Sequence, residues 1–391
     1  MIRDSSPLRS SLLALTLTSV YLSYLFPGID LSRNLLVGIA TACIIGSRRC
    51  SLSLGGVVPL VVGAVLLVAS WSLHETDAFM SYSVHFALLS VIGLLLCSGP
   101  INIVIVSKIC TVILGLSLWW SILFFGNTED AGTLLGASYA LVGPLACCAA
   151  VAVNRDLIVA WRLAALCVAL VLSFELLIEA NRGAIVCLGA LGVLYLATRG
   201  TARRGVVIWR YCVLGVACWL VIQYGGAMLL WVSERLAGLG VNSRAVEHSI
   251  DLESRGASLD SGRAELIERG ISLLSSWEHW MFGRGVGYFE EAVGTYVHNL
   301  AIECLVEGGL LYCLFPLATI GRCLIALVSK REDWPVLIVG LCVGVVPLML
   351  SSVYWTFPAY WLFVYYVWCG RAAFVGRELA TTIRTDVGVK G

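Results

Sequence analysis

The sequence predicts an all-α membrane protein with about twelve transmembrane helices and one large, partly helical periplasmic loop. Of its 391 residues, 59% are hydrophobic and only 13% are charged, and the mean hydropathy is +0.90. Soluble domains carry about 25% charged residues, so this chain cannot cover itself with polar surface in water. Apolar runs near the length of a spanning helix, about 20 residues, also recur along most of the chain.

These runs define twelve expected spans. They lie at residues 11–26, 34–46, 53–73, 78–98, 101–125, 131–153, 157–178, 183–198, 206–231, 300–328, 335–353 and 358–374. The first span follows two arginines, as a signal peptide would. It lacks a convincing small-residue cleavage site, so we expect it to be retained.

The positions of Lys and Arg predict the orientation of the chain. Cytoplasmic loops are enriched in these residues, and most of the 26 fall on one side when the spans are counted from a cytoplasmic N-terminus. We therefore expect both termini in the cytoplasm, including the tail at 375–391. Residues 1–231 and 298–374 form the expected membrane part, with membrane lipid as a partner. The net charge of +1 argues against a nucleic-acid partner.

Residues 232–297 form the long polar segment, which this topology puts on the periplasmic side. Its mixed, nearly balanced charge with embedded apolar residues is typical of a folded element. Between residues 263 and 277, apolar residues recur at spacings of three and four: Ala264, Ile267, Ile271 and Leu274. This stripe predicts a helix lying against the membrane or the transmembrane bundle.

The fifteen cysteines predict neither a disulfide framework nor a zinc site. Almost all of them lie in apolar stretches, and none lies in the long polar loop. No two histidines stand at the helical spacing i, i+4 that many zinc sites use. We therefore expect no metal and no cofactor.

Two arginines are candidates for binding an anion. Arg182 stands at the outer start of the eighth span, where a buried guanidinium is costly. Arg263 stands at the start of the loop helix, where free N–H groups also favour an anion. A guanidinium binds phosphate oxygens at two points. The plainer alternatives are an Arg182 paired with Glu179 and a solvated Arg263 near Glu265.

A glycine-rich segment at 282–289 precedes the tenth span. The glycines at 283, 285 and 287 permit positive φ angles, so Gly285, Gly287 and the intervening chain can bring main-chain N–H groups to a ligand, with Arg284 beside them. A sharp turn that returns the chain to the membrane explains the same glycines equally well.

His298, at the outer boundary of the tenth span, is the candidate general base. An imidazole, with an ordinary pKa of about 6.5, accepts a proton near neutral pH. Glu303 and Glu307 follow it on one face of the same helix, four residues apart. We expect these carboxyls either to orient a cation such as Arg182 or to act as neutral packing groups.

The order of these features resembles the bacterial O-antigen ligase family. His298 and Asn299, followed after nine residues by Gly309 and after two more by Tyr312, are similar to the family motif, in which His-Asn, His-Ser or His-Gln precedes such a glycine. The glycine-rich segment is similar to the stretch before that histidine. Arg263 and Arg182 resemble the arginines within and before the family's loop. The resemblance covers residues 180–315, with one departure at Asn181, where Ser is frequent.

The resemblance implies an inverting, metal-independent glycosyltransferase at the periplasmic face of the bacterial inner membrane. The donor would be a glycan linked to undecaprenyl diphosphate, and the acceptor would be lipid A-core, as in lipopolysaccharide assembly. Arg182 and Arg263 would bind the donor diphosphate, and His298 would be the base. The supporting residues would be Asn299, Glu303, Glu307, Arg284, Gly285 and Gly287.

Two other functions remain as alternatives. An O-antigen or exopolysaccharide polymerase would use a lipid-linked repeat as the acceptor, although the single large loop and the Gly309-to-Tyr312 ending favour a ligase. A multi-span transporter or flippase would predict inverted repeats or helices broken at corresponding places, and the sequence shows neither.

Overall fold

In the computed structural model of the chain, every element of the described residues is helical. The structure describes residues 6–25, 31–46, 53–73, 76–99, 101–124, 131–154, 156–179, 263–328, 334–349 and 353–369, together with residues 189, 231 and 235. Within these residues there are α-helices and short 3-10 helices but no strand. The all-α fold class is therefore confirmed for the described part of the chain.

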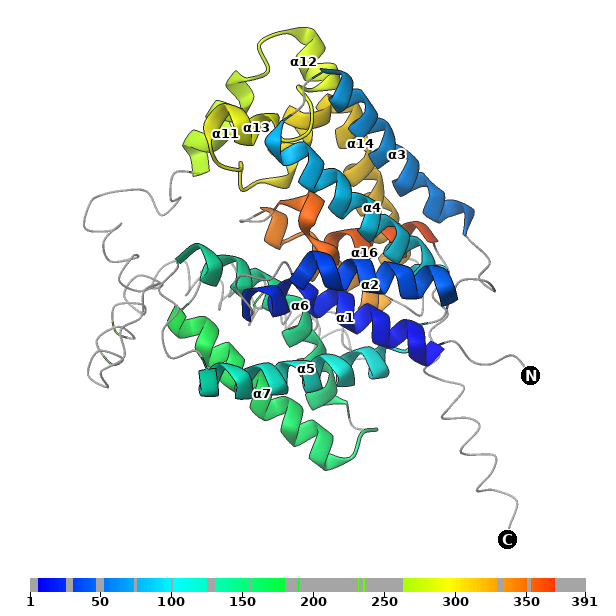
Figure 1. The fold of residues 1–391 in the computed structure, drawn as a ribbon, viewed down its shortest axis with the longest axis vertical. Helices are drawn as coiled ribbons and strands as arrows, with labels where there is room; N and C mark the ends of the chain where they lie inside the picture. Colours follow the sequence, from blue (N-terminus) through cyan, green and yellow to red (C-terminus); the bar gives the residue numbers. More distant parts are fainter. Residues whose placement is uncertain are drawn as a thin grey trace, which may run out of the picture.

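Seven helices come from the N-terminal part of the chain (Figure 1). They are α1 (Ser6–Leu25), α2 (Leu31–Gly46), α3 (Leu54–Leu73), α4 (Asp77–Cys97), α5 (Ile103–Phe124), α6 (Ala131–Val153) and α7 (Val159–Glu179). They coincide with the first seven predicted spans to within a few residues. The C-terminal part contributes α14 (Leu300–Val328), α15 (Trp334–Gly344) and α16 (Pro358–Cys369).

Three described helices are long and apolar enough to cross a membrane. They run over Leu54–Ser72 in α3, Ala78–Cys97 in α4 and Leu300–Leu327 in α14, and five shorter apolar helices accompany them. These helices indicate membrane association, but the full set of twelve spans is not confirmed. The predicted spans 183–198 and 206–231 lie outside the described residues, apart from residues 189 and 231.

The predicted span 335–353 is not one helix. Helix α15 ends at Gly344, and two 3-10 helices follow, η2 (Pro347–Met349) and η3 (Tyr354–Thr356), before α16 begins. Proline explains both boundaries. Pro347 lacks the N–H that would continue α15 and its ring clashes with the preceding turn, whereas Pro358 stands at the first position of α16, where no helical N–H bond is lost.

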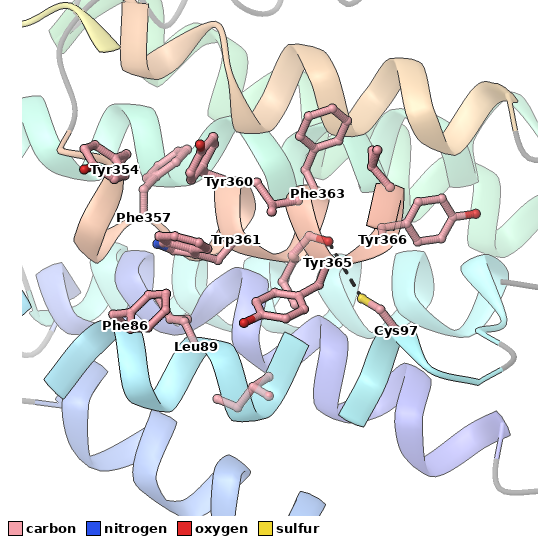
Figure 2. Close-up of a cluster of buried hydrophobic side chains, with 14 of the residues drawn as sticks. Phe86, Leu89, Cys97, Tyr354, Phe357, Tyr360, Trp361, Phe363, Tyr365 and Tyr366 are labelled. Atoms are coloured by element: carbon pink, nitrogen blue, oxygen red, sulfur yellow. Dashed lines mark hydrogen bonds between the residues drawn. The ribbon is translucent and has the colours of Figure 1, made fainter. Parts of the chain in front are cut away.

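A cluster of buried aromatic side chains lies between α4 and α16 (Figure 2). Nearly every side chain of α16 is buried. Phe86 of α4 packs its edge against the ring of Trp361, with 4.9 Å between the ring centres, and against Trp355 of η3, at 5.6 Å. The Cys97 thiol donates a hydrogen bond to the carbonyl oxygen of Leu362 at 3.7 Å. The α4–α16 pair therefore holds η3 against the rest of the bundle.

Three short helices precede α14 and sit at one end of the molecule, beside the upper ends of α3 and α14 in Figure 1. They are α11 (Arg263–Ser272), α12 (Trp277–Phe282) and α13 (Tyr288–Val293). The long polar loop is therefore helical over its described part, in agreement with the sequence. The rest of the loop, from residue 232 to 262, lies outside the described residues apart from residue 235.

The predicted apolar stripe of the loop helix is partly wrong. Helix α11 ends at Ser272; of the predicted stripe, Leu274 is buried and Ile267 half-buried, whereas Ala264 and Ile271 are exposed. Leu266 and Leu273 are the residues that pack on the small core formed by Phe289, Val297 and Val306. Gly270 lies between them, against Ile302 of α14. The glycine lets α11 approach α14 closely, because a Cβ at this position would collide with the Ile302 side chain.

Candidate functional site

His298 and Asn299 form the entrance to α14. His298 has a φ of 55°, in the left-handed region that few residues other than glycine adopt. Its ring lies 4.1 Å from the ring of Tyr296, centre to centre. The Asn299 side-chain oxygen accepts hydrogen bonds from the N–H groups of Ala301 (3.0 Å) and Ile302 (3.2 Å). Asn299 therefore caps α14, and the turn at His298 directs the chain into that cap.

Helix α14 breaks at Gly309. Its φ of 65° and ψ of −169° interrupt the helix, so the carbonyls of Val306 and Glu307 lose their helical donors. We call residues 300–308 the upper segment of α14 and residues 310–328 its lower segment. A Cβ at Gly309 would collide with the Met281 carbonyl of α12, so the two backbones touch directly at the break.

The glycine-rich turn fills the break. Gly283, Gly285 and Gly287 have φ values of 75°, 106° and 75°. The N–H of Arg284 donates to the carbonyl of Val306 (2.6 Å), and the N–H of Gly285 donates to the carbonyl of Glu307 (2.9 Å). These two bonds satisfy the carbonyls that the break releases.

The same turn also contacts α3 and the start of α4. The N–H of Val286 donates to Ser70 Oγ of α3 at 3.0 Å, and the N–H of Gly287 donates to Glu307 Oε1 at 3.0 Å. Thr76, the N-cap of α4, donates its hydroxyl to the Val286 carbonyl at 3.1 Å. Four successive main-chain N–H groups of the turn are thus bonded within the protein. This geometry corresponds to the alternative of a sharp packing turn.

Glu307 joins three segments of the chain. The side chain is 1% exposed. Besides the N–H of Gly287, it accepts hydrogen bonds at Oε2 from the Tyr354 hydroxyl (2.5 Å) and from Trp355 Nε1 (2.8 Å). The carboxyl therefore fixes the glycine-rich turn and η3 to the upper segment of α14.

Glu303, one turn closer to His298, is as deeply buried as Glu307 but has fewer hydrogen bonds. It is 2% exposed, and its Oε1 has no hydrogen-bond partner among the described residues. Nearby, Glu290 of α13 accepts a hydrogen bond from the Tyr82 hydroxyl of α4 at 2.9 Å. Burial raises the pKa of Glu290 above its ordinary value. Three carboxyls, those of Glu290, Glu303 and Glu307, are therefore gathered near the upper segment and interact electrostatically.

Arg284 holds the connection between α11 and α12. Its Nε donates to the Leu273 carbonyl at 3.0 Å, and its Nη2 donates to Ser275 Oγ at 3.2 Å. The guanidinium also stands over the ring of Tyr288, 5.2 Å from its centre. These contacts give Arg284 a positioning role within the three-helix element.

The two arginines proposed for the diphosphate are placed only in part. Arg263 is the first residue of α11, the helix that packs on the upper segment through Gly270, but its side chain lies outside the described residues. Arg182 also lies outside them. Among the described residues, no group of three or more His, Cys, Asp or Glu side chains has the arrangement of a metal site.

Several site residues could not be found from the sequence. Tyr82 and Glu290 are separated by more than 200 residues, and the Tyr354–Trp355 pair lies in the short connection between the predicted spans 335–353 and 358–374. Glu290 is one of many acidic residues in the loop, and no local pattern distinguishes it. The adjacent glycines Gly308 and Gly309 within an apolar run are the local signal for the break.

The fold and the site define an all-helical, membrane-associated protein with a three-helix element clamped onto a broken helix. No protein-family model, curated protein or solved structure matches the chain.

Proposed function

We propose that this protein is a membrane glycosyltransferase that moves a glycan from undecaprenyl diphosphate to a sugar hydroxyl of lipid A-core. The observation that supports the proposal is the construction around His298. A histidine in a left-handed backbone conformation is followed by a capping Asn299 and stands on a helical segment that two other chain segments hold in place. Strained backbone of this kind is concentrated at functional sites.

The proposed reaction needs one proton acceptor and one anion-binding site. His298 takes the proton of the acceptor hydroxyl while its oxygen bonds to the anomeric carbon. The bond from that carbon to the diphosphate oxygen breaks, and undecaprenyl diphosphate leaves with the electron pair, on the opposite face of the sugar. Negative charge grows on the leaving diphosphate, so fixed guanidinium groups stabilise the transition state more than the ground state. We assign this role to Arg182 and Arg263.

The packing of α11 on α14 is consistent with this assignment. Helix α11 starts at Arg263 and lies against Ile302, four residues after His298. The scaffold thus brings the backbone of Arg263 into the same three-helix element that leads to the imidazole. Glu307, Arg284, Gly285 and Gly287 support the site by holding this element together rather than by touching substrate.

The experiment that tests the proposal is a transfer reaction with purified protein in lipid. The lipid-linked glycan is supplied together with either lipid A-core or a second lipid-linked repeat. We expect the mass of the lipid A-core acceptor to increase by that of the glycan. Elongation of the lipid-linked repeat instead would identify a polymerase, and no product with either acceptor would reject the transferase proposal.

A further inference from the structure

The apolar surface of α14 changes abruptly at its break. In the upper segment, Ala301 is exposed and the residues from Ile302 to Gly309 are buried or half-buried under α11, α12 and α13. From Leu310 onward the helix exposes leucines at helical spacing: Leu310, Leu311, Leu314, Leu317 and Leu324. A face of exposed leucines on a helix of this length is the surface that lipid covers. The lipid-facing surface of α14 therefore begins at the break.

Helix α3 has a matching surface that stops at the same level. Its exposed residues include Val61, Val65 and Val68, and the series ends with Trp71, which is 65% exposed. The preceding residue, Ser70, accepts the hydrogen bond from the glycine-rich turn that fills the break in α14. The ends of the two lipid-facing surfaces are therefore at one level, tied together by the same turn.

Exposed aromatic side chains gather at this level. Helix α12, whose last residues touch Gly309, has no buried residue. It exposes Trp277 (67%), Trp280 and Phe282. The helix lies at the same end of the molecule as the upper end of α3 (Figure 1). Tryptophan is enriched where a membrane protein passes from the hydrocarbon to the headgroups of the bilayer.

The lengths of the helices agree with a boundary at this level. The lower segment of α14 spans 19 residues at about 1.5 Å per residue, which is roughly 28 Å. The 20 residues of α3 span about 30 Å. Both values match a hydrocarbon core about 30 Å thick. If all of α14 were in the hydrocarbon, its upper segment would place two carboxyls there, and such groups are costly at that depth.

We propose that Trp71, Trp277, Trp280 and Phe282, here called the aromatic collar, bind the lipid surface at the boundary between hydrocarbon and headgroups. Helix α14 leaves the hydrocarbon at Gly309, and its upper segment stands outside. The upper segment rises about 1.5 Å per residue, so His298 lies more than about 10 Å beyond the boundary. This inference depends on α3 and α14 crossing the membrane and not on the proposed transferase activity.

The test replaces single residues by the photoreactive p-benzoylphenylalanine in full-length protein reconstituted into vesicles of phosphatidylethanolamine and phosphatidylglycerol. After irradiation, intact mass spectrometry identifies what each position has captured. For Trp277→p-benzoylphenylalanine and Trp280→p-benzoylphenylalanine we expect a mass increase of one phospholipid, with attachment near the carbonyl end of the acyl chain. Leu314 on the lower segment should capture lipid further along the chain. Glu268, exposed on α11, is the water-facing control and should capture none.

Two results would overturn the proposal. Lipid capture at Leu314 but not at Trp277 or Trp280 would place α12 away from the bilayer. A product of twice the protein mass from the α12 positions would make this face an interface with a second copy. Fluorescence gives an independent measurement. Phospholipids brominated near the headgroup should quench a component of the emission that is lost in the Trp277→Phe/Trp280→Phe variant, and equal quenching of both proteins would also reject the collar.

Discussion

The two segments of α14, on either side of the break at Gly309, differ in what surrounds them. The lower segment exposes leucines along its length and is apolar except toward its far end, where Arg322 lies over the ring of Trp368 and Thr319 accepts a hydrogen bond from Trp368 Nε1. The upper segment contains Glu303 and Glu307, is covered by α11, α12 and α13, and exchanges hydrogen bonds with the glycine-rich turn and η3. Apolar contacts along its length stabilise the lower segment, whereas specific hydrogen bonds stabilise the upper segment.

This difference indicates where substitutions should matter. A lipid-facing leucine loses little when it is shortened, because lipid replaces the missing contacts. A buried carboxyl or a main-chain N–H that loses its partner pays the full desolvation cost, about 1–3 kcal/mol for each group. We therefore expect substitutions before Gly309 to destabilise the protein more than substitutions of the exposed leucines after it.

The largest expected effect is on the rate of glycan transfer when His298, which precedes the upper segment, is replaced. His298→Ala should lower the rate of glycan transfer by on the order of 10²- to 10⁴-fold, the usual contribution of a general base. The measurement is the rate of acceptor mass increase with purified protein in lipid. His279→Ala is the matched control, because that imidazole, on α12, contacts Ser275. Wild-type transfer by the His298 variant would remove the residue from the mechanism.

The next largest effect should come from Glu307. Glu307→Ala leaves the Tyr354 hydroxyl, Trp355 Nε1 and the N–H of Gly287 without their acceptor. At about 1–3 kcal/mol for each group, we expect a loss of roughly 3 kcal/mol or more in the free energy of unfolding. Thermal unfolding followed by tryptophan fluorescence checks this. Leu314→Ala, on the lower segment, is the control and should unfold close to the parent protein; equal losses for both variants would contradict the distinction between the segments.

The break itself provides the third prediction. Gly283→Ala and Gly309→Ala each combine a positive φ with a collision against opposing backbone, so we expect each to destabilise the protein by about 2–4 kcal/mol. Gly294→Ala measures the cost of the positive φ alone. Gly294 also has a positive φ, of 78°, but nothing lies within 4 Å of its added Cβ. This substitution should cost only about 1–2 kcal/mol. The unfolding temperatures of the three variants separate the cost of the positive φ from the cost of the collision. A decrease for Gly294→Ala as large as for Gly309→Ala would show that the backbone contact contributes nothing to stability.

A smaller effect is expected at the start of α11. Arg263→Lys keeps the charge but removes the planar fork of the guanidinium, so we expect transfer to slow by about tenfold, the equivalent of one charge-assisted hydrogen bond. The same transfer assay measures this. Arg269→Lys is the control, because Arg269 on the same helix pairs with Glu265 at the surface. A variant with unchanged transfer would show that charge alone suffices at Arg263.

The helical fold could be predicted from the sequence because hydropathy and length determine it locally. The first seven predicted spans and the start of α14 match the helices to within a few residues. The end of α15 could have been predicted from Pro347, because proline cannot continue a helix. Hydropathy alone misses this boundary, because the residues on both sides of Pro347 are apolar.

The connections at the site could not be predicted. The sequence marks Glu307 as an unusual carboxyl, but the bonds that stabilise it come from residues 20 and 47 positions away in the sequence. The sequence also predicts that the glycines at 283, 285 and 287 can adopt positive φ angles, and in the structure they do. Whether their N–H groups face a ligand or another helix depends on the break at Gly309, which releases the carbonyls of Val306 and Glu307, 22 positions away from Arg284 and Gly285 in the sequence.

The smallest expected effect concerns the pH dependence of the contact between α13 and α4. Because burial raises the pKa of Glu290 above its ordinary value of 4.5, its neutral form is favoured in the folded protein. Its contribution to stability is therefore present below pH 4.5 and is lost as the pH rises through the folded pKa. Glu290→Gln keeps an acceptor for the Tyr82 hydroxyl and should flatten this decline. Glu303 and Glu307 titrate nearby, so the informative quantity is the difference in unfolding temperature between variant and parent across pH. Glu265→Gln is the exposed control, and a Glu290→Gln profile that parallels the parent would show that the α13–α4 contact does not depend on this proton.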